Sequence, residues 1–287
     1  VAPPDVIEPL DFEQILSEML TELAERAPEL DAQIESEPFV KLLEVCAFRE
    51  LQLRARINDA ARAVMLPYST GADLDNLGAL FGVERLMLSP AVPTAIPPIP
   101  AVYESDSDFR YRIQLSLEGL STAGPEGAYM FHALSADGQV LDASAISPTP
   151  GQVLITVLSR AGTGVPSAAL LATVLAKLSD ESVRPLTDYV QVQPATIAQY
   201  QVTATLYFYT GPDREVIMAN ARAALEAYTN GQHRLGLDVT LSGIYAALHQ
   251  PGVQRVDLAS PTANLVVNRQ SASYCTAINL TDGGLDE

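Results

Sequence analysis

Residues 37–65 read EPFVKLLEVCAFRELQLRARINDAARAVM, and this pattern predicts one long helix. Pro38 suits the first turn of a helix, and Pro67 bars its continuation. At 1.5 Å per residue such a helix is about 42 Å long, which exceeds most helices of globular proteins. A heptad-like series interrupted by Glu50 runs along it: Phe39, Leu43, Cys46, Leu53, Ile57, Ala60 and Val64.

The helix is apolar on nearly every side at its N-terminal end, so other elements must cover it. Between Phe39 and Phe48 only Lys41 and Glu44 are polar, and such a helix needs neighbours on several sides. An ordinary core within the chain and a bundle completed by helices of another chain both satisfy this need. The flanking elements are short, which favours the bundle. The candidate interface residues are Leu16, Leu20, Leu23, Phe39, Leu43, Phe48 and Leu51.

Two further helices complete a predicted N-terminal arm over residues 1–88. Apolar residues from Phe12 to Leu23 form one stripe of a 3.6-residue period, with Asp11 as the N-cap and Pro28 as the end. A short helix that contains Leu74 should stop at Gly82. The first fifty residues hold thirteen acidic side chains against three basic ones, so we expect an arm with an acidic polar face.

The composition changes after the arm. Residues 89–100 contain five prolines, which a regular helix or a central strand cannot hold. We predict a stiff extended connector there and a domain boundary. A middle domain over residues 101–195 and a C-terminal domain over residues 196–287 should follow.

The two predicted C-terminal domains mix helices and strands, which makes the fold class α+β. In the middle domain we expect helices near residues 105–120, 125–136 and 166–178, and strands near residues 139–146, 151–158 and 188–193. In the C-terminal domain we expect a helix over residues 241–248 and strands near residues 202–209, 253–258, 264–267 and 275–280.

Part of the middle domain is echoed later in the chain. A strand, a helix and an Arg-to-Asp spacing of four residues occur first with Arg184 and Asp188. The same order of features occurs again later in the chain. A helix from Pro212 is followed by Arg234 and Asp238, which lead into Val239. We interpret this as two related strand-helix-strand units, while a shared local turn is the simpler alternative.

Composition restricts the classes of partner and compartment. The net charge of -18 repels phosphate backbones and anionic lipid, so nucleic acid and membrane surfaces are poor partners. No stretch reaches the length of a membrane span, and two cysteines are too few for a disulfide scaffold. We therefore expect a folded protein that is made in the cytosol.

A search for catalytic residues finds no candidate constellation. His132, His233 and His249 are far apart in sequence, and neither a HExxH run nor a cysteine pair offers metal-ligand spacing. The glycines at 162 and 164 lack the third glycine of a dinucleotide fingerprint and the lysine of a phosphate loop. We expect no catalytic residue, no cofactor site and no metal site, and therefore no enzyme.

Several runs of residues together resemble a known family. They are residues 35–43 (ESEPFVKLL), 48–51 (FREL), 58–66 (NDAARAVML), 70–75 (TGADLD), 104–106 (ESD), 234–236 (RLG) and 244–249 (IYAALH). The similarity continues through residues 252–256 almost to Gly284. In these runs the chain resembles the baseplate J family of phages similar to P2, which also occurs in R-type pyocins.

The resemblance implies a structural wedge subunit in the baseplate of a contractile phage or pyocin tail. Its implied partners are a second copy in another conformation and baseplate proteins of the I and W types, with the central hub and spike nearby. It also implies assembly in the bacterial host cytoplasm and a part in the rearrangement that triggers contraction. A generic binding adaptor and, less favoured, a cell-wall hydrolase are the alternative functions.

Overall fold

The computed structural model describes residues 8–28, 37–121, 123–211 and 213–286. These residues form two compact units. Unit 1 is Val1–Arg85 with Asp106–Arg110, and unit 2 is Leu86–Ser105 with Tyr111–Glu287. The predicted α+β class is confirmed, because helices fill unit 1 and small mixed sheets with helices fill unit 2. Glu35, Ser36 and Pro212, on which parts of the sequence analysis rest, lie outside the described residues.

Unit 1 contains three helices and the start of a fourth. They are α1 (Phe12–Arg26), α2 (Pro38–Ala63), α3 (Gly71–Leu80) and the first turn of α4 (Asp106–Gly119). The Asp11 side chain accepts the Gln14 N–H at 3.1 Å, so the predicted N-cap of α1 is confirmed. Pro38 occupies the first turn of α2, also as predicted.

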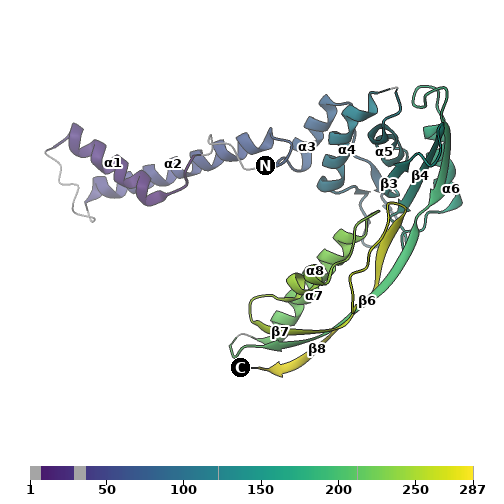
Figure 1. Ribbon diagram of the computed structural model, residues 1–287. Helices are drawn as coiled ribbons and strands as arrows, with labels where there is room; N and C mark the ends of the chain where they lie inside the picture. The colour runs from purple at the N-terminus through teal and green to yellow at the C-terminus, as the bar shows by residue number, and fades with distance from the viewer. Residues whose placement is uncertain (1–7, 29–36, 122, 212, 287) are drawn as a thin grey trace. The chain divides into compact units, whose positions relative to one another are not determined.

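Helices α1 and α2 pack against each other and run in opposite directions (Figure 1). The backbone N–H of Glu8 donates to the Asn58 side chain at 2.8 Å, and the Asn58 amide donates to the Glu8 carbonyl at 2.9 Å. Ile15 of α1 and the α2 residues Val40 and Ala47 are buried. One side of α2 is therefore covered within the chain.

The proline-rich segment differs from the predicted connector. Strand β1 (Met87–Ser89) pairs antiparallel with β2 (Val102–Tyr103), and Val92 forms a bridge with Ile99 between them. Residues 89–100 therefore form the end of a hairpin, and the two strands that flank them lie side by side. A buried ion pair between Glu104 and Arg112 holds the base of this hairpin to α4. Prolines suit this loop because it needs few backbone hydrogen bonds.

The first three-stranded sheet of unit 2 has the order β3-β4-β5. Its strands are β3 (Val140–Ile146), β4 (Gln152–Ser159) and β5 (Tyr189–Pro194), and its helices are α5 (Glu126–Leu134) and α6 (Ala168–Leu178). β4 pairs antiparallel with β3 and parallel with β5. Ile155 and Val157 of β4 and Val174 and Leu178 of α6 belong to its buried core.

The second sheet has the order β7-β6-β8. Its strands are β6 (Thr196–Phe208), β7 (Val253–Ser260) and β8 (Ser271–Leu285). Helices α7 (Arg214–Gln232) and α8 (Leu241–Leu248) lie against one face of it (Figure 1). Leu206, Phe208, Leu225, Ile244 and Leu248 are fully buried between sheet and helices.

The two sheets share a plan that differs in detail from the predicted repeat. Each has a central strand, β4 or β6, with one antiparallel and one parallel neighbour. In the second sheet the parallel neighbour is β8, whereas the expected strand at Val239 makes only an isolated bridge with Leu265. The strand expected over residues 264–267 is reduced to the same bridge. Asp238 accepts the Val267 N–H and holds this loop in place of a strand ladder.

Candidate interface of the helical arm

The side of α2 that α1 leaves open carries large apolar side chains. Leu53, Ile57 and Val64 are 59%, 54% and 71% exposed. With them lie Leu42, Val45 and Cys46, which are also exposed. Spacings of three, four and seven residues put these six side chains on one helical face. We call this set the α2 stripe: Leu42, Val45, Cys46, Leu53, Ile57 and Val64.

The α2 stripe borders a shallow groove between α1 and α2. The groove has a volume of about 630 Å³, and Val45, Leu53 and Ile57 line it together with Met19 of α1. Charged side chains rim it, among them Arg54, which contacts Glu50 at 2.5 Å and Glu18 at 3.8 Å. The Arg54 side chain is only 19% exposed, but its partners Glu18 and Glu50 are 56% and 37% exposed, so water weakens these ion pairs. The groove therefore offers an apolar floor with a charged rim, as protein interfaces do.

The seven candidate interface residues do not share one environment. Leu16, Leu20 and Leu23 of α1 and Phe39, Leu43 and Leu51 of α2 are half-buried. Phe48 is 51% exposed. The exposed members of the predicted heptad series are Cys46, Leu53, Ile57, Ala60 and Val64. The series therefore follows the open side of α2 over its C-terminal half, while its N-terminal members Phe39 and Leu43 turn partly toward the chain itself.

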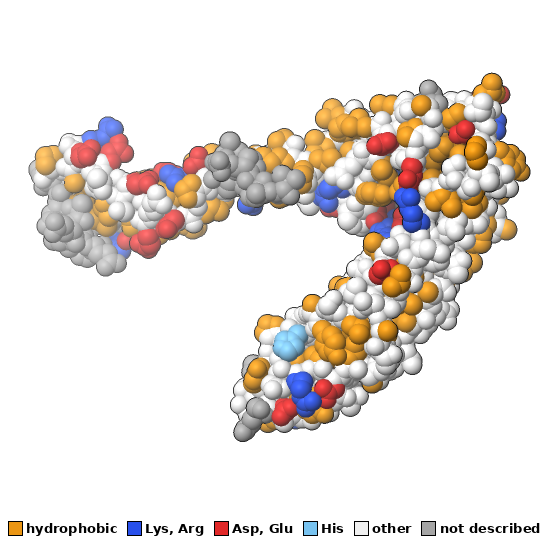
Figure 2. Space-filling view, in the orientation of Figure 1, with side chains coloured by type: hydrophobic (Ala, Val, Ile, Leu, Met, Phe, Trp, Pro, Cys, Tyr) orange, Lys and Arg blue, Asp and Glu red, His pale blue; other side chains and the backbone are white. Residues whose placement is uncertain are grey.

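Sequence reasoning missed two members of the α2 stripe, Leu42 and Val45, because the N-terminal half of α2 is apolar all round. In such a segment periodicity cannot tell the covered side from the open one. Figure 2 shows hydrophobic side chains exposed along the arm among acidic ones. Full burial of a large aliphatic side chain contributes about 1.5–3 kcal/mol, so covering the half-exposed α2 stripe would contribute several kcal/mol.

Two other kinds of site are absent from the described residues. Within the described ranges, no group of three or more His, Cys, Asp and Glu side chains is placed to hold a metal ion. Over the same ranges, no helix is both long and apolar enough to cross a bilayer.

Three segments of the chain match the domains of one known family. Residues 35–92 match the baseplate J-like N-terminal domain, residues 121–194 the baseplate J-like central domain, and residues 200–281 the baseplate J-like protein C-terminal domain. Baseplate protein J of Escherichia phage P2 is 53% identical over 99% of this chain and 96% of its own length. The chain belongs to the baseplate J-like family. The resemblance read from the residues is thus confirmed, and the family is one of structural baseplate components and not of enzymes.

A solved assembly gives a weaker likeness. A chain in the baseplate of the anti-feeding prophage, AFP, is 14% identical, with a TM-score of 0.39 over 63% of this chain and 44% of that one. We draw no conclusion from a score this low.

Proposed function

We propose that this baseplate J-like chain is a wedge subunit of a contractile tail, and that helices of other chains cover the α2 stripe in the assembled baseplate. The observation that supports this most directly is that Leu53, Ile57 and Val64 stay more than half exposed although α1 packs along α2. An exposed apolar row on a long helix is costly to leave in water and is typical of an assembly surface.

The proposal extends to particular partners. A second copy in another conformation and proteins of the I and W types would contribute to the bundle, with the hub and spike nearby. The particle would be a phage tail or an R-type pyocin, built in the bacterial cytoplasm. Residues 196–287 would contact the neighbouring wedge, because closing a ring requires a surface separate from the bundle. Opening of that ring would accompany contraction.

The proposed division is an arm, residues 1–88, and two small α+β domains, residues 101–195 and 196–287. Each of the two sheets has a hydrophobic core of its own, which supports the separation of the last two. The hairpin over residues 89–100 belongs with the second unit, since both its strands do.

The double variant Leu53→Asp with Ile57→Asp tests the proposed bundle. Two carboxylates in a dry seam would cost several kcal/mol, so complete baseplates should not form in a host that lacks the native gene. Because both residues are exposed in the free chain, its free energy of unfolding should change by less than about 1 kcal/mol. Electron microscopy of particles and urea unfolding of the purified chain give the two readouts.

Leu120→Asp with Leu186→Asp is the matched control. These leucines are 79% and 96% exposed but belong to unit 2, whereas the α2 stripe belongs to unit 1. The control variant should assemble like the native chain. Complete baseplates built from the arm variant would refute the bundle.

A generic adaptor remains the competing function. An adaptor would associate with the particle transiently, whereas a wedge subunit stays in it. Mass spectrometry of purified tails separates the two, because a wedge subunit should be present in fixed ratio to hub and sheath proteins after high-salt washing.

A further inference from the structure

The strand β8 is an edge strand without the usual protection. β6 is its one neighbouring strand among the described residues, and only its first residues have a second partner, through the bridge between Ala272 and Leu235 and the hydrogen bond from the Gly236 N–H to the Ser271 carbonyl. Between residues 271 and 281 it contains neither a charged side chain nor a proline. The other edge of this sheet, β7, carries Arg255 and Asp257, and β5 is short and ends at Pro194. Natural proteins guard free edges with such features, so the part of the β8 edge that follows Ser273 is available for pairing.

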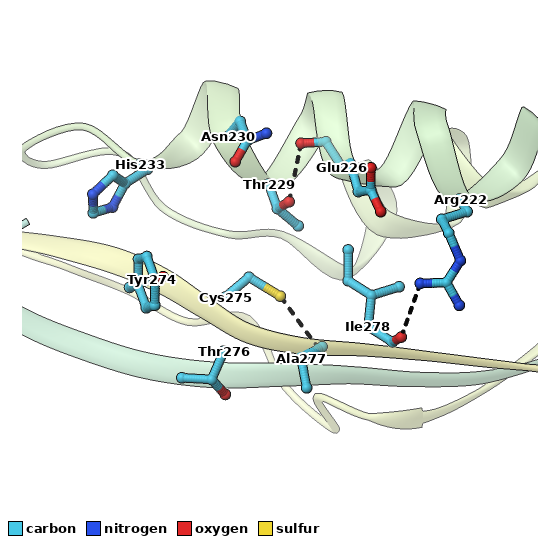
Figure 3. Close-up of a pocket in the computed structure, with 10 residues that line it drawn as sticks. All are labelled: Arg222, Glu226, Thr229, Asn230, His233, Tyr274, Cys275, Thr276, Ala277 and Ile278. Atoms are coloured by element: carbon cyan, nitrogen blue, oxygen red, sulfur yellow. Dashed lines mark hydrogen bonds between the residues drawn. The ribbon is translucent and has the colours of Figure 1, made fainter. Parts of the chain in front are cut away.

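A groove lies between this edge and helix α7. Arg222, Glu226, Asn230 and His233 line it from α7, four residues or fewer apart along one helical face (Figure 3). Residues 274–278 of β8 form the opposite wall, and the groove has a volume of about 370 Å³. A helix beside a free strand edge is the arrangement in which several domains take up an extended peptide.

Two backbone carbonyls of β8 show that its outer edge accepts hydrogen bonds in this groove. His233 Nδ1 donates to the Ser273 carbonyl at 2.5 Å, and Arg222 Nη1 donates to the Ile278 carbonyl at 3.2 Å. One donor lies on α7 and the other is the residue that follows it, so both carbonyls point toward the groove. Backbone N–H groups of an added strand offer the same kind of donor.

The groove also favours a bound segment that carries a positive charge. Glu226 is exposed, and no Lys or Arg among the described residues forms an ion pair with it. Arg222, one turn earlier, is engaged with the Ile278 carbonyl. The rings of His233 and Tyr274 meet edge to face, with centroids 5.3 Å apart, and give the same groove an aromatic wall about two helical turns from Glu226. The aliphatic stem of a lysine or arginine can lie against such a wall.

We propose that β8 and α7 bind an extended segment of a partner protein, which joins the sheet as a fourth strand and places a Lys or Arg side chain on Glu226. The β8 strand of a second copy fits less well, because residues 271–285 contain no Lys or Arg to place on Glu226. This inference concerns a surface separate from the α2 stripe and stands without the proposed wedge bundle.

Nuclear magnetic resonance of the isotope-labelled full chain tests the proposal with three capped synthetic peptides. Their sequences are TVTKTVT, TVTETVT and TVTPTVT. The lysine peptide should shift the amide resonances of residues 272–280. The glutamate peptide should bind at least about fivefold more weakly, which corresponds to one exposed ion pair. The proline peptide should not bind, because proline lacks the N–H that the ladder needs.

Glu226→Gln should make the lysine and glutamate peptides bind equally, whereas Glu215→Gln, on the same helix outside the groove, should preserve their difference. Absence of β8 shifts at millimolar lysine peptide would overturn the proposal, as would equal binding of both peptides to the native chain. Shifts of β8 that depend on protein concentration without peptide would also overturn it, because they would make a second copy the occupant.

Discussion

At the scale of single residues, buried polar side chains decide contacts that periodicity does not show. Asn58 is 2% exposed near the C-terminal end of α2, and its amide exchanges two hydrogen bonds with the backbone of Glu8. A helical pattern assigns asparagine to the solvent side, and its partner is fifty residues away in sequence. Buried polar groups require such partners, but only the folded chain identifies them.

His132 gives a prediction about pH. It lies half-buried on α5, with Nε2 3.2 Å from the Gly119 carbonyl. Burial, helped by the charge of Lys177, lowers its pKa below the ordinary value, although the Gly119 carbonyl opposes this. The folded chain therefore binds this proton less readily than the unfolded chain. The resulting stability is complete above about pH 6.5 and is lost as the pH falls below it.

His132→Gln should remove that part of the pH dependence. Urea unfolding between pH 7.5 and pH 5 should show a smaller loss of unfolding free energy in the variant than in the native chain. Carboxylates titrate in both proteins, so their contribution to the loss of unfolding free energy cancels in the comparison. Equal losses would show that burial of His132 does not affect its proton affinity.

At the scale of elements, helices were easier to predict than strand pairing. Periodicity, Asp11 and Pro38 located α1 and α2 within a few residues of their observed bounds. The β1-β2 hairpin was missed because its strands are only three and two residues long and five prolines lie between them. The extension of β8 to Leu285 was also missed, since Gly283 and Gly284 normally end a strand.

Two helical glycines should respond oppositely to alanine. A Cβ at Gly78 of α3 would lie 2.5 Å from Phe109 Cζ and 2.9 Å from the Val83 carbonyl, whereas a Cβ at Gly231 of α7 would meet no atom within 4 Å. Alanine usually stabilises a helix by about 0.5–1 kcal/mol over glycine, and Gly231→Ala should show this gain. Overpacking costs about 1–3 kcal/mol, so Gly78→Ala should be destabilising. Urea unfolding of both variants measures the two changes in the free energy of unfolding. A higher value for Gly78→Ala than for the native chain would contradict the packing described here.

At the scale of the whole molecule, unit 2 joins its two sheets through backbone and side chains. β5 leads into β6 through the buried Ala195, and Leu158 and Ala272 pack with it. The Arg234 guanidinium donates to the Leu141 carbonyl, and the Leu235 N–H donates to Asp142 at 2.9 Å. These contacts join residues 93 positions apart, so the sequence indicated two domains but not how they are joined.

The α2 stripe belongs to the same scale, because in our proposal helices of other chains cover it. The sequence indicated an apolar helix that needs neighbours, and the structure shows which side α1 leaves open. No pattern within one chain identifies the helix that covers the open side.

The most direct measurement is a reconstruction of the assembled baseplate by electron cryomicroscopy at side-chain resolution. The account predicts a helix of another chain packed on α2 over Leu53 and Ile57, with an axis-to-axis distance of about 8–10 Å. A baseplate in which these two side chains face solvent, or are covered only by their own chain, would contradict it.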